Sequence, residues 1–126
     1  MSYRKGITTT VDLIPEGTVM ATPVTKVFEV RGVEVANFLF KLTGATSNKI
    51  TIKLESSDNE TDFYNLINVE DTGGVSAITK KVWEFTMTTS ADNIEVPVNL
   101  QNQFLKVTVS STNTSGTVGL KMTRVE

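Results

Sequence analysis

The residues best suited to chemistry are acidic and amide side chains gathered in one short polar stretch. Asp58, Asn59, Glu60 and Asp62 follow an alternating segment, and oxygen atoms of this kind are the ligands that Ca²⁺ takes in proteins. Their spacing does not match an EF-hand loop, and no glycine stands at its sharp turn. We therefore interpret residues 56–62 as a solvated loop that holds no metal, with a calcium site as the alternative.

Acid–base catalysis by a pair of carboxylates is a second possibility, because glycosidases use two such groups across the scissile bond. The candidates are Glu55, Glu60, Asp62, Glu84 and Glu95. Most of them fall at the outward positions of alternating segments, where charged side chains are expected in any case. The sequence also has no histidine and no cysteine, so the commonest general base and thiolate chemistry are both absent. We expect no catalytic residue and no cofactor.

Exposed aromatic rings offer a third possibility, a platform for binding a sugar. Phe63, Tyr64 and Trp83 are the candidate residues. Trp83 lies in an alternating segment, and a single tryptophan among strand residues usually belongs to the core because it buries a large apolar area. Tyr64 points away from the apolar face of its own segment, so we predict that Tyr64 is the exposed ring.

The elements that position these residues are strands, and the clearest evidence lies in residues 33–55. Ile50, Ile52 and Leu54 alternate with polar residues in 49–55, as in a strand with one dry face. Residues 33–43 have apolar residues on both faces, with Val35 and Leu39 opposite an inward set of Ala36, Phe38, Phe40 and Leu42. We predict that the two segments form a hairpin through a turn at 44–48. The two-sided arm would then lie in the middle of a sheet or under a partner subunit.

The rest of the sequence repeats this alternation and shows no helical spacing. Further alternating segments are residues 24–30, 63–69, 82–89, 94–98, 104–110 and 118–122. Residues 14–18 contain Pro15 and Gly17 and are predicted to form a turn. With about eight strands separated by short turns, we predict an all-β, jelly-roll-like sandwich of two antiparallel sheets. Residues 1–126 form one domain, in which 1–14 are an extended N-terminal arm or an edge strand.

Charge and composition narrow the range of partners. The net charge is -2, so no basic field attracts nucleic acid or anionic lipid. No apolar run approaches the ~20 residues that a membrane helix needs, and no apolar segment follows the charged start as in a secretory signal. We predict a protein made in the cytosol that binds neither nucleic acid nor membrane.

Several segments taken together resemble the jelly-roll capsid cement (head-decoration) proteins of tailed bacteriophages. In those proteins a strand is followed by an L-x-S-S-D loop opening and later by V-P-L-like and R-F-L-x-V-like strands. The matching segments here are Phe38–Gly44, Ile50–Asp58, Val96–Leu100 and Gln103–Val109. Gln103 stands where a basic residue is common, and Asn99 intervenes before Leu100. The resemblance implies a homotrimer, or a similar oligomer, that sits on capsid proteins, locks neighbouring capsomers and has no catalytic residue.

These observations lead to one functional prediction and one alternative. We predict a non-enzymatic virion structural protein on the capsid surface, assembled in the host cytoplasm, whose partners are its own copies and the major capsid protein. The predicted partner contacts are Tyr3, Arg4 and Ile7 in the arm, and Val35 and Leu39 on the two-sided strand. The alternative is a carbohydrate-binding module or a tail-fibre, receptor-binding β domain that uses exposed aromatic residues.

Overall fold

The computed structural model describes residues 8–30, 32–33, 35–66, 68–70, 78–80, 82–100 and 102–125. The strands are β1 (Thr8–Val19), β2 (Val24–Glu29), β3 (Val35–Thr43), β4 (Lys49–Ser57), β5 (Tyr64–Asn65), β6 (Asn68–Glu70), β7 (Ile78–Lys80), β8 (Trp83–Thr86), β9 (Ala91–Asn99), β10 (Phe104–Ser111) and β11 (Thr117–Val125). No helix occurs in these residues, so none of them forms a helix that could span a membrane.

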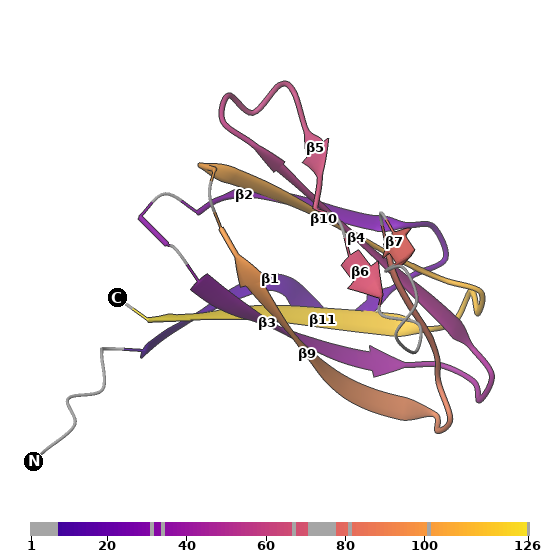
Figure 1. Ribbon diagram of the computed structural model, residues 1–126. Coiled ribbons are helices and arrows are strands. Elements are labelled where there is room, and N and C mark those ends of the chain that lie inside the picture. The colour runs from indigo at the N-terminus through magenta and orange to yellow at the C-terminus, as the bar shows by residue number, and fades with distance from the viewer. Residues whose placement is uncertain are drawn as a thin grey trace, which may run out of the picture.

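The main strands form two sheets that lie face to face (Figure 1). Sheet A has the order β1-β11-β3-β9, and sheet B has the order β2-β10-β4, with β5 and β8 both along the other edge of β4. The pairs β1–β11, β2–β10, β3–β9 and β4–β8 are all antiparallel and are nested inside one another. Nested pairs of this kind arise when one long hairpin rolls up on itself, and the resulting strand order is that of a jelly roll. The predicted fold class is confirmed.

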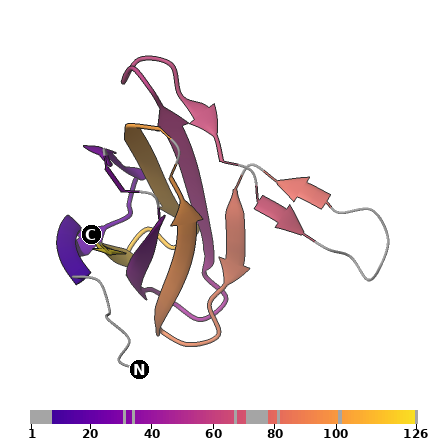
Figure 2. The same ribbon diagram turned by 60° about the vertical axis from the view of Figure 1, so that its left-hand side comes forward.

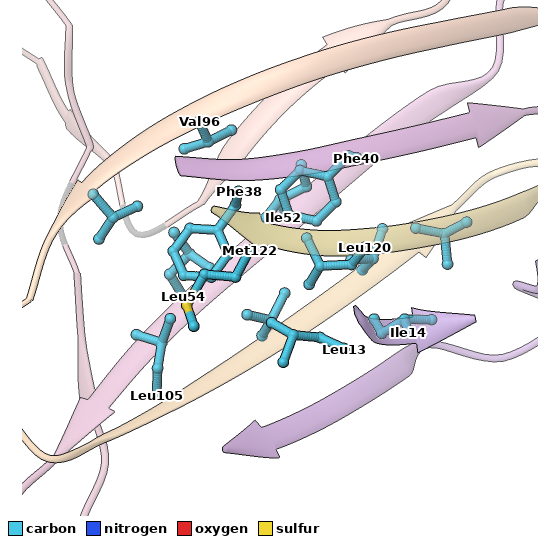
Figure 3. Close-up of a cluster of buried hydrophobic side chains, with 14 of the residues drawn as sticks. Leu13, Ile14, Phe38, Phe40, Ile52, Leu54, Val96, Leu105, Leu120 and Met122 are labelled. Atoms are coloured by element: carbon cyan, nitrogen blue, oxygen red, sulfur yellow. The ribbon is translucent and has the colours of Figure 1, made fainter. Parts of the chain in front are cut away.

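Alternate side chains from both sheets fill the space between them. Phe38, Phe40, Leu120 and Met122 point inward from sheet A and meet Ile52, Leu54 and Leu105 of sheet B (Figure 3). All of these side chains are at most 2% exposed. Burial of each such side chain contributes about 1.5–3 kcal/mol. The inward faces predicted for 33–43, 49–55, 104–110 and 118–122 are therefore confirmed.

The predicted hairpin between residues 33–43 and 49–55 is wrong. β3 pairs with β11 and β9 in sheet A, whereas β4 pairs with β10, β5 and β8 in sheet B, so residues 44–48 cross from one sheet to the other. Both segments alternate because both face the same core, but they face it from opposite sides. Alternation reveals which side chains are inward and does not reveal the sheet to which a strand belongs.

Asn48 fixes this crossing by hydrogen bonds inside the protein. It is only 3% exposed. Its Oδ1 accepts hydrogen bonds from Ser111 Oγ at 2.6 Å, Thr112 Oγ1 at 3.1 Å and the backbone N of Asn113 at 2.9 Å. Its backbone O accepts from the N–H of Met87 at 2.8 Å. One side chain thus ties the β3–β4 crossing to the β10–β11 turn, and its backbone ties the crossing to the residue after β8.

The predicted turn at residues 14–18 is a bulge within β1. Ile14 pairs with Leu120 and Thr18 pairs with Val118, so residues 15–17 stand opposite Gly119 alone. Gly17 takes a φ of +86°, which favours glycine. A Cβ at Gly119 would lie 2.8 Å from the Cα of Glu16, so the bulge packs on β11 where a side chain would stand. Proline and glycine here bend a strand without ending it.

The segment predicted as one strand at 63–69 divides between two elements. β5 pairs with β4 in sheet B, whereas β6 pairs with β7 in a small sheet of their own. Figure 2 shows this small sheet standing to one side of the sandwich. The β5–β7 region is therefore an insertion between β4 and β8, at the tip of the rolled hairpin.

Truncating a core residue from either sheet tests the shared interior. We expect Phe38→Ala and Ile52→Ala each to lower the free energy of unfolding by about 2–5 kcal/mol, because each leaves a cavity in a packed core. Chemical denaturation measures the loss. Val27→Ala, at an exposed position on the outer face of sheet B, is the control and should change stability by less than about 0.5 kcal/mol. Losses below about 1 kcal/mol at both core sites would contradict the inward assignment.

Removing the Asn48 side chain tests the crossing. We expect Asn48→Ala to lower the free energy of unfolding by about 1–3 kcal/mol, because partly buried donors lose their acceptor. Thr46→Ala, an exposed change in the same crossing, is the control and should be nearly neutral. Equal stability of the two variants would show that the Asn48 bonds do not hold the crossing in place.

Candidate functional site

The outer face of sheet A carries two of the residues predicted to contact a partner. Val35 and Leu39 alternate with the buried residues of β3 and are 54% and 36% exposed. Because β3 lies between β11 and β9, both side chains sit within the sheet face and away from its edges. The other predicted contacts, Tyr3, Arg4 and Ile7, lie outside the described residues.

A groove of about 660 Å³ opens beside Leu39 on the same face. The β1 bulge forms one wall of the groove, since Pro15 and Glu16 lie in its lining together with Gly119 of β11. Glu16 on the bulge forms an ion pair with Lys41 of β3 at 3.2 Å, so the pair spans β11 between them. Pro15, Asn93 and Lys121 also line the groove. Grooves of this volume accommodate small ligands or short peptide segments.

The outer face of sheet B differs, because its charged residues are paired with one another. Glu55 lies 3.6 Å from Lys53 and 3.9 Å from Lys106, and Lys49 lies 3.3 Å from Glu84. The Lys106 ammonium also stands 4.4 Å from the centre of the Phe63 ring. Among the described residues, these three lysines and two glutamates of the face are therefore engaged in ion pairs with one another.

The acidic loop that follows β4 is held by its own hydrogen bonds. Ser57 Oγ accepts from the backbone N of Asn59 at 3.2 Å and of Glu60 at 2.9 Å. Asn59 Oδ1 accepts from the backbone N of Thr61 and of Asp62, both at 2.9 Å, and from Ser57 Oγ at 3.0 Å. Asn59 Nδ2 also donates to Asp62 Oδ2 at 3.1 Å, so the amide and hydroxyl oxygens of the loop and one carboxylate already accept hydrogen bonds. Within the part of the chain that the structure describes, no three acidic residues gather as metal ligands.

The carboxylates considered as a catalytic pair do not converge. Glu55 and Glu84 lie on the outer face of sheet B in ion pairs with lysines. Glu95 pairs across the ladder with Leu39 on the outer face of sheet A, on the opposite side of the sandwich. Glu60 and Asp62 belong to the exposed loop after β4. This arrangement places no two of these acids across a shared cleft.

The burial of Trp83 and Tyr64 agrees with the prediction. Trp83 is partly buried and packs against the core, whereas Tyr64 is 63% exposed. Phe63 is partly buried and its ring faces Lys106. Tyr64 is thus the exposed ring of the three.

The groove beside Leu39 was not predicted from the sequence. Its signal is the combination of Pro15 and Gly17 inside a segment whose apolar residues continue on both sides, which is typical of a bulge. Nothing in the sequence links that bulge to Gly119, because the pairing of the first strand with the last becomes visible only in the fold.

Comparison with known proteins supports the fold. No protein-family model and no curated protein matches the sequence. Among solved structures, the chain is similar to the SPBc2 prophage-derived protein YomS, with a TM-score of 0.55 and 16% identity over 100% of this chain and 99% of that chain. It is also similar to a chain of Broad Bean Stain Virus, with a TM-score of 0.50 and 10% identity over 100% of this chain and 90% of that chain. At these identities the similarity establishes a shared all-β sandwich.

Chelation distinguishes a self-supporting loop from a calcium site. We expect EDTA to leave the melting temperature unchanged, and we expect Asn59→Ala to lower stability by about 1 kcal/mol because two backbone donors lose their acceptor. Asp58→Ala, which removes a charge from the same loop, is the control. A clear drop in melting temperature on chelation, reversed by added Ca²⁺, would overturn this description of the loop.

Proposed function

We propose that this protein is a virion structural protein: a capsid decoration, or cement, protein that forms a homotrimer and binds the major capsid protein through the outer face of sheet A. It binds by burying surface at several contacts. Because a symmetric oligomer presents the same contact several times, the copies together bind more tightly than one copy alone. No step of chemistry is required of it. Two structural neighbours, one a prophage-derived protein and one a chain of a plant virus, support a viral role.

The contrast between the two outer faces carries the proposal. Sheet A presents Val35, Leu39 and a groove, with the Glu16–Lys41 pair at its rim. Sheet B presents ion-paired lysines and glutamates together with Val27, and no described groove opens among them. The core of a protein interface is depleted in charge and enriched in apolar groups relative to the rest of the surface. Sheet A differs from sheet B in offering a groove beside its exposed apolar residues, and this groove is what favours it as the docking face.

The sheet edges favour contact through a face over contact through strand pairing. The β1 edge is interrupted by its bulge, and Pro97 in β9 has no amide hydrogen to donate. Lys26 in β2 pairs with the buried Val107 and so places a charge on the inner side of that edge. The remaining edge of β4 is covered by β5 and β8. Bulges, prolines and inward charges of this kind prevent strands of different copies from pairing.

Sugar binding is the second candidate, and the exposure of Tyr64 is the observation that favours it. A glycan array with the purified protein decides between the two. Signal on defined glycans that Tyr64→Ala abolishes, together with a monomer in solution, would favour the sugar-binding domain. A trimer without glycan signal is what the cement role predicts.

Charge placed on the docking face should disrupt assembly. We expect Val35→Lys/Leu39→Lys to convert the trimer to a monomer and to lower binding to capsids of the encoding virus at least tenfold, because two lysines would be buried in the contact. Size-exclusion chromatography with light scattering measures the mass, and co-sedimentation measures capsid binding. Val27→Lys, at an exposed position on the outer face of sheet B, is the control. Loss of assembly in the control alone would place the contact on the other face.

A further inference from the structure

One end of the sandwich is made of connections that carry no charge. Residues 20–23, 44–48, 87–90 and 112–116 lie together there, on the right in Figure 1. None of these segments contains Asp, Glu, Lys or Arg, although such residues make up 21% of the sequence. The loop after β4, at the opposite end, contains three carboxylates. We call the four uncharged connections the hydroxyl end.

The hydroxyl end presents groups that are free to bind a partner. Six of its serine and threonine side chains are exposed and form no hydrogen bond with any residue that the structure describes. They are Thr22, Thr46, Ser47, Thr88, Ser90 and Thr114. Uncharged hydroxyl groups cost much less free energy to remove from water than charged groups do. This end of the molecule is therefore suited to contact with another protein surface.

Hydrogen bonds hold the four connections of the hydroxyl end together. The N–H of Met20 donates to the carbonyl of Gly116 at 2.8 Å, which joins the first connection to the last. The N–H of Gly44 donates to the carbonyl of Ser90 at 3.0 Å, which joins the second to the third. The Asn48 side chain joins the second to the fourth. A surface that is already ordered loses little conformational entropy on binding.

The outer face of sheet A presents charges of both signs beside its apolar residues. One row across the sheet consists of Asp12, Lys121, Leu39 and Glu95, since each is the ladder partner of the next. All four are exposed, and the three charged ones form no ion pair with any residue that the structure describes. A partner with net charge of either sign would meet like charges here. Hydroxyl groups donate to carboxylates and accept from ammonium groups, so an uncharged, hydroxyl-rich partner fits both signs.

We propose that the hydroxyl end of one copy docks on the outer face of sheet A of the next copy, over the groove and the row from Asp12 to Glu95. The contact joins two different patches, and contacts of this kind close into a ring when the rotation between copies allows it. The inference rests on the trimer proposed above, and it identifies the second of the two patches by which the copies hold one another.

Mixing two variants tests whether these two patches meet. Thr46→Lys/Thr114→Lys places charge on the hydroxyl end, and Val35→Lys/Leu39→Lys places charge on the face. Each variant alone should be a monomer by size-exclusion chromatography with light scattering, at concentrations where the natural protein is a trimer. An equimolar mixture should contain at least tenfold more of a species with the mass of two copies than either variant alone. The reason is that the intact face of the first variant can bind the intact hydroxyl end of the second.

A matched control and three results complete the test. Thr61→Lys, at an exposed threonine in the loop of the opposite end, should remain a trimer. A trimeric Thr46→Lys/Thr114→Lys variant would overturn docking of the hydroxyl end and leave the cement role standing. Two monomeric variants whose mixture also stays monomeric would overturn the pairing of these patches. A natural protein that is monomeric at every concentration would overturn both this contact and the proposed trimer.

Discussion

The structure depends on the filling of one interior by alternate side chains from two opposed sheets. Phe38 and Phe40 from one side and Ile52 and Leu54 from the other are almost completely buried. The ring of Phe28 in sheet B also meets that of Phe38 in sheet A, with centroids 6.0 Å apart. Because alternate residues of the described sandwich strands are committed to this interior, the outward residues are the strand positions left for contact with partners. The two outer faces are thus the places where function can differ.

Packing of the core does not by itself determine how the strands are connected. Hydrogen bonds and close backbone contacts fix the connections. Asn48 joins the β3–β4 crossing to the β10–β11 turn, and neighbouring backbone bonds such as Gly44 N to Ser90 O at 3.0 Å join it to the β8–β9 connection. On the other side, Gly119 lets the β1 bulge rest on β11. A buried amide with all of its acceptor capacity used is costly to place elsewhere, so it favours a single arrangement. The same bulge that seats β1 also lines the groove on the outer face of sheet A.

Much of the fold was predictable from the sequence because burial and side-chain period are directly linked. The inward residues of β3, β4, β10 and β11 follow from alternation alone. Strand pairing was not predictable, since alternation is identical for a hairpin and for two strands in opposite sheets, and this is why residues 33–55 were misassigned. The β1 bulge was misassigned for a related reason: Pro15 and Gly17 signal a bend, and only pairing with β11 shows that the strand continues.

The candidate site was likewise predictable from the sequence only in part. Val35 and Leu39 were predicted because apolar residues at outward positions of a strand are visible in the sequence, and both are exposed in the fold. The groove beside them requires residues from β1, β3, β9 and β11, which are distant in the sequence and adjacent only after the chain has rolled up. The loop after β4 was predicted to be solvated, with a calcium site as the alternative, and its internal hydrogen bonds became evident only from the backbone geometry.

The central claim is that the outer face of sheet A docks and the outer face of sheet B remains in solvent. Cryo-electron microscopy of intact particles of the encoding virus tests it most directly. We expect ordered density for this protein on the capsid surface, with β3 and the β1 bulge against a neighbouring copy or the capsid protein and the lysine–glutamate face turned outward. Density with sheet B in the contact, or particles that lack this protein altogether, would contradict it.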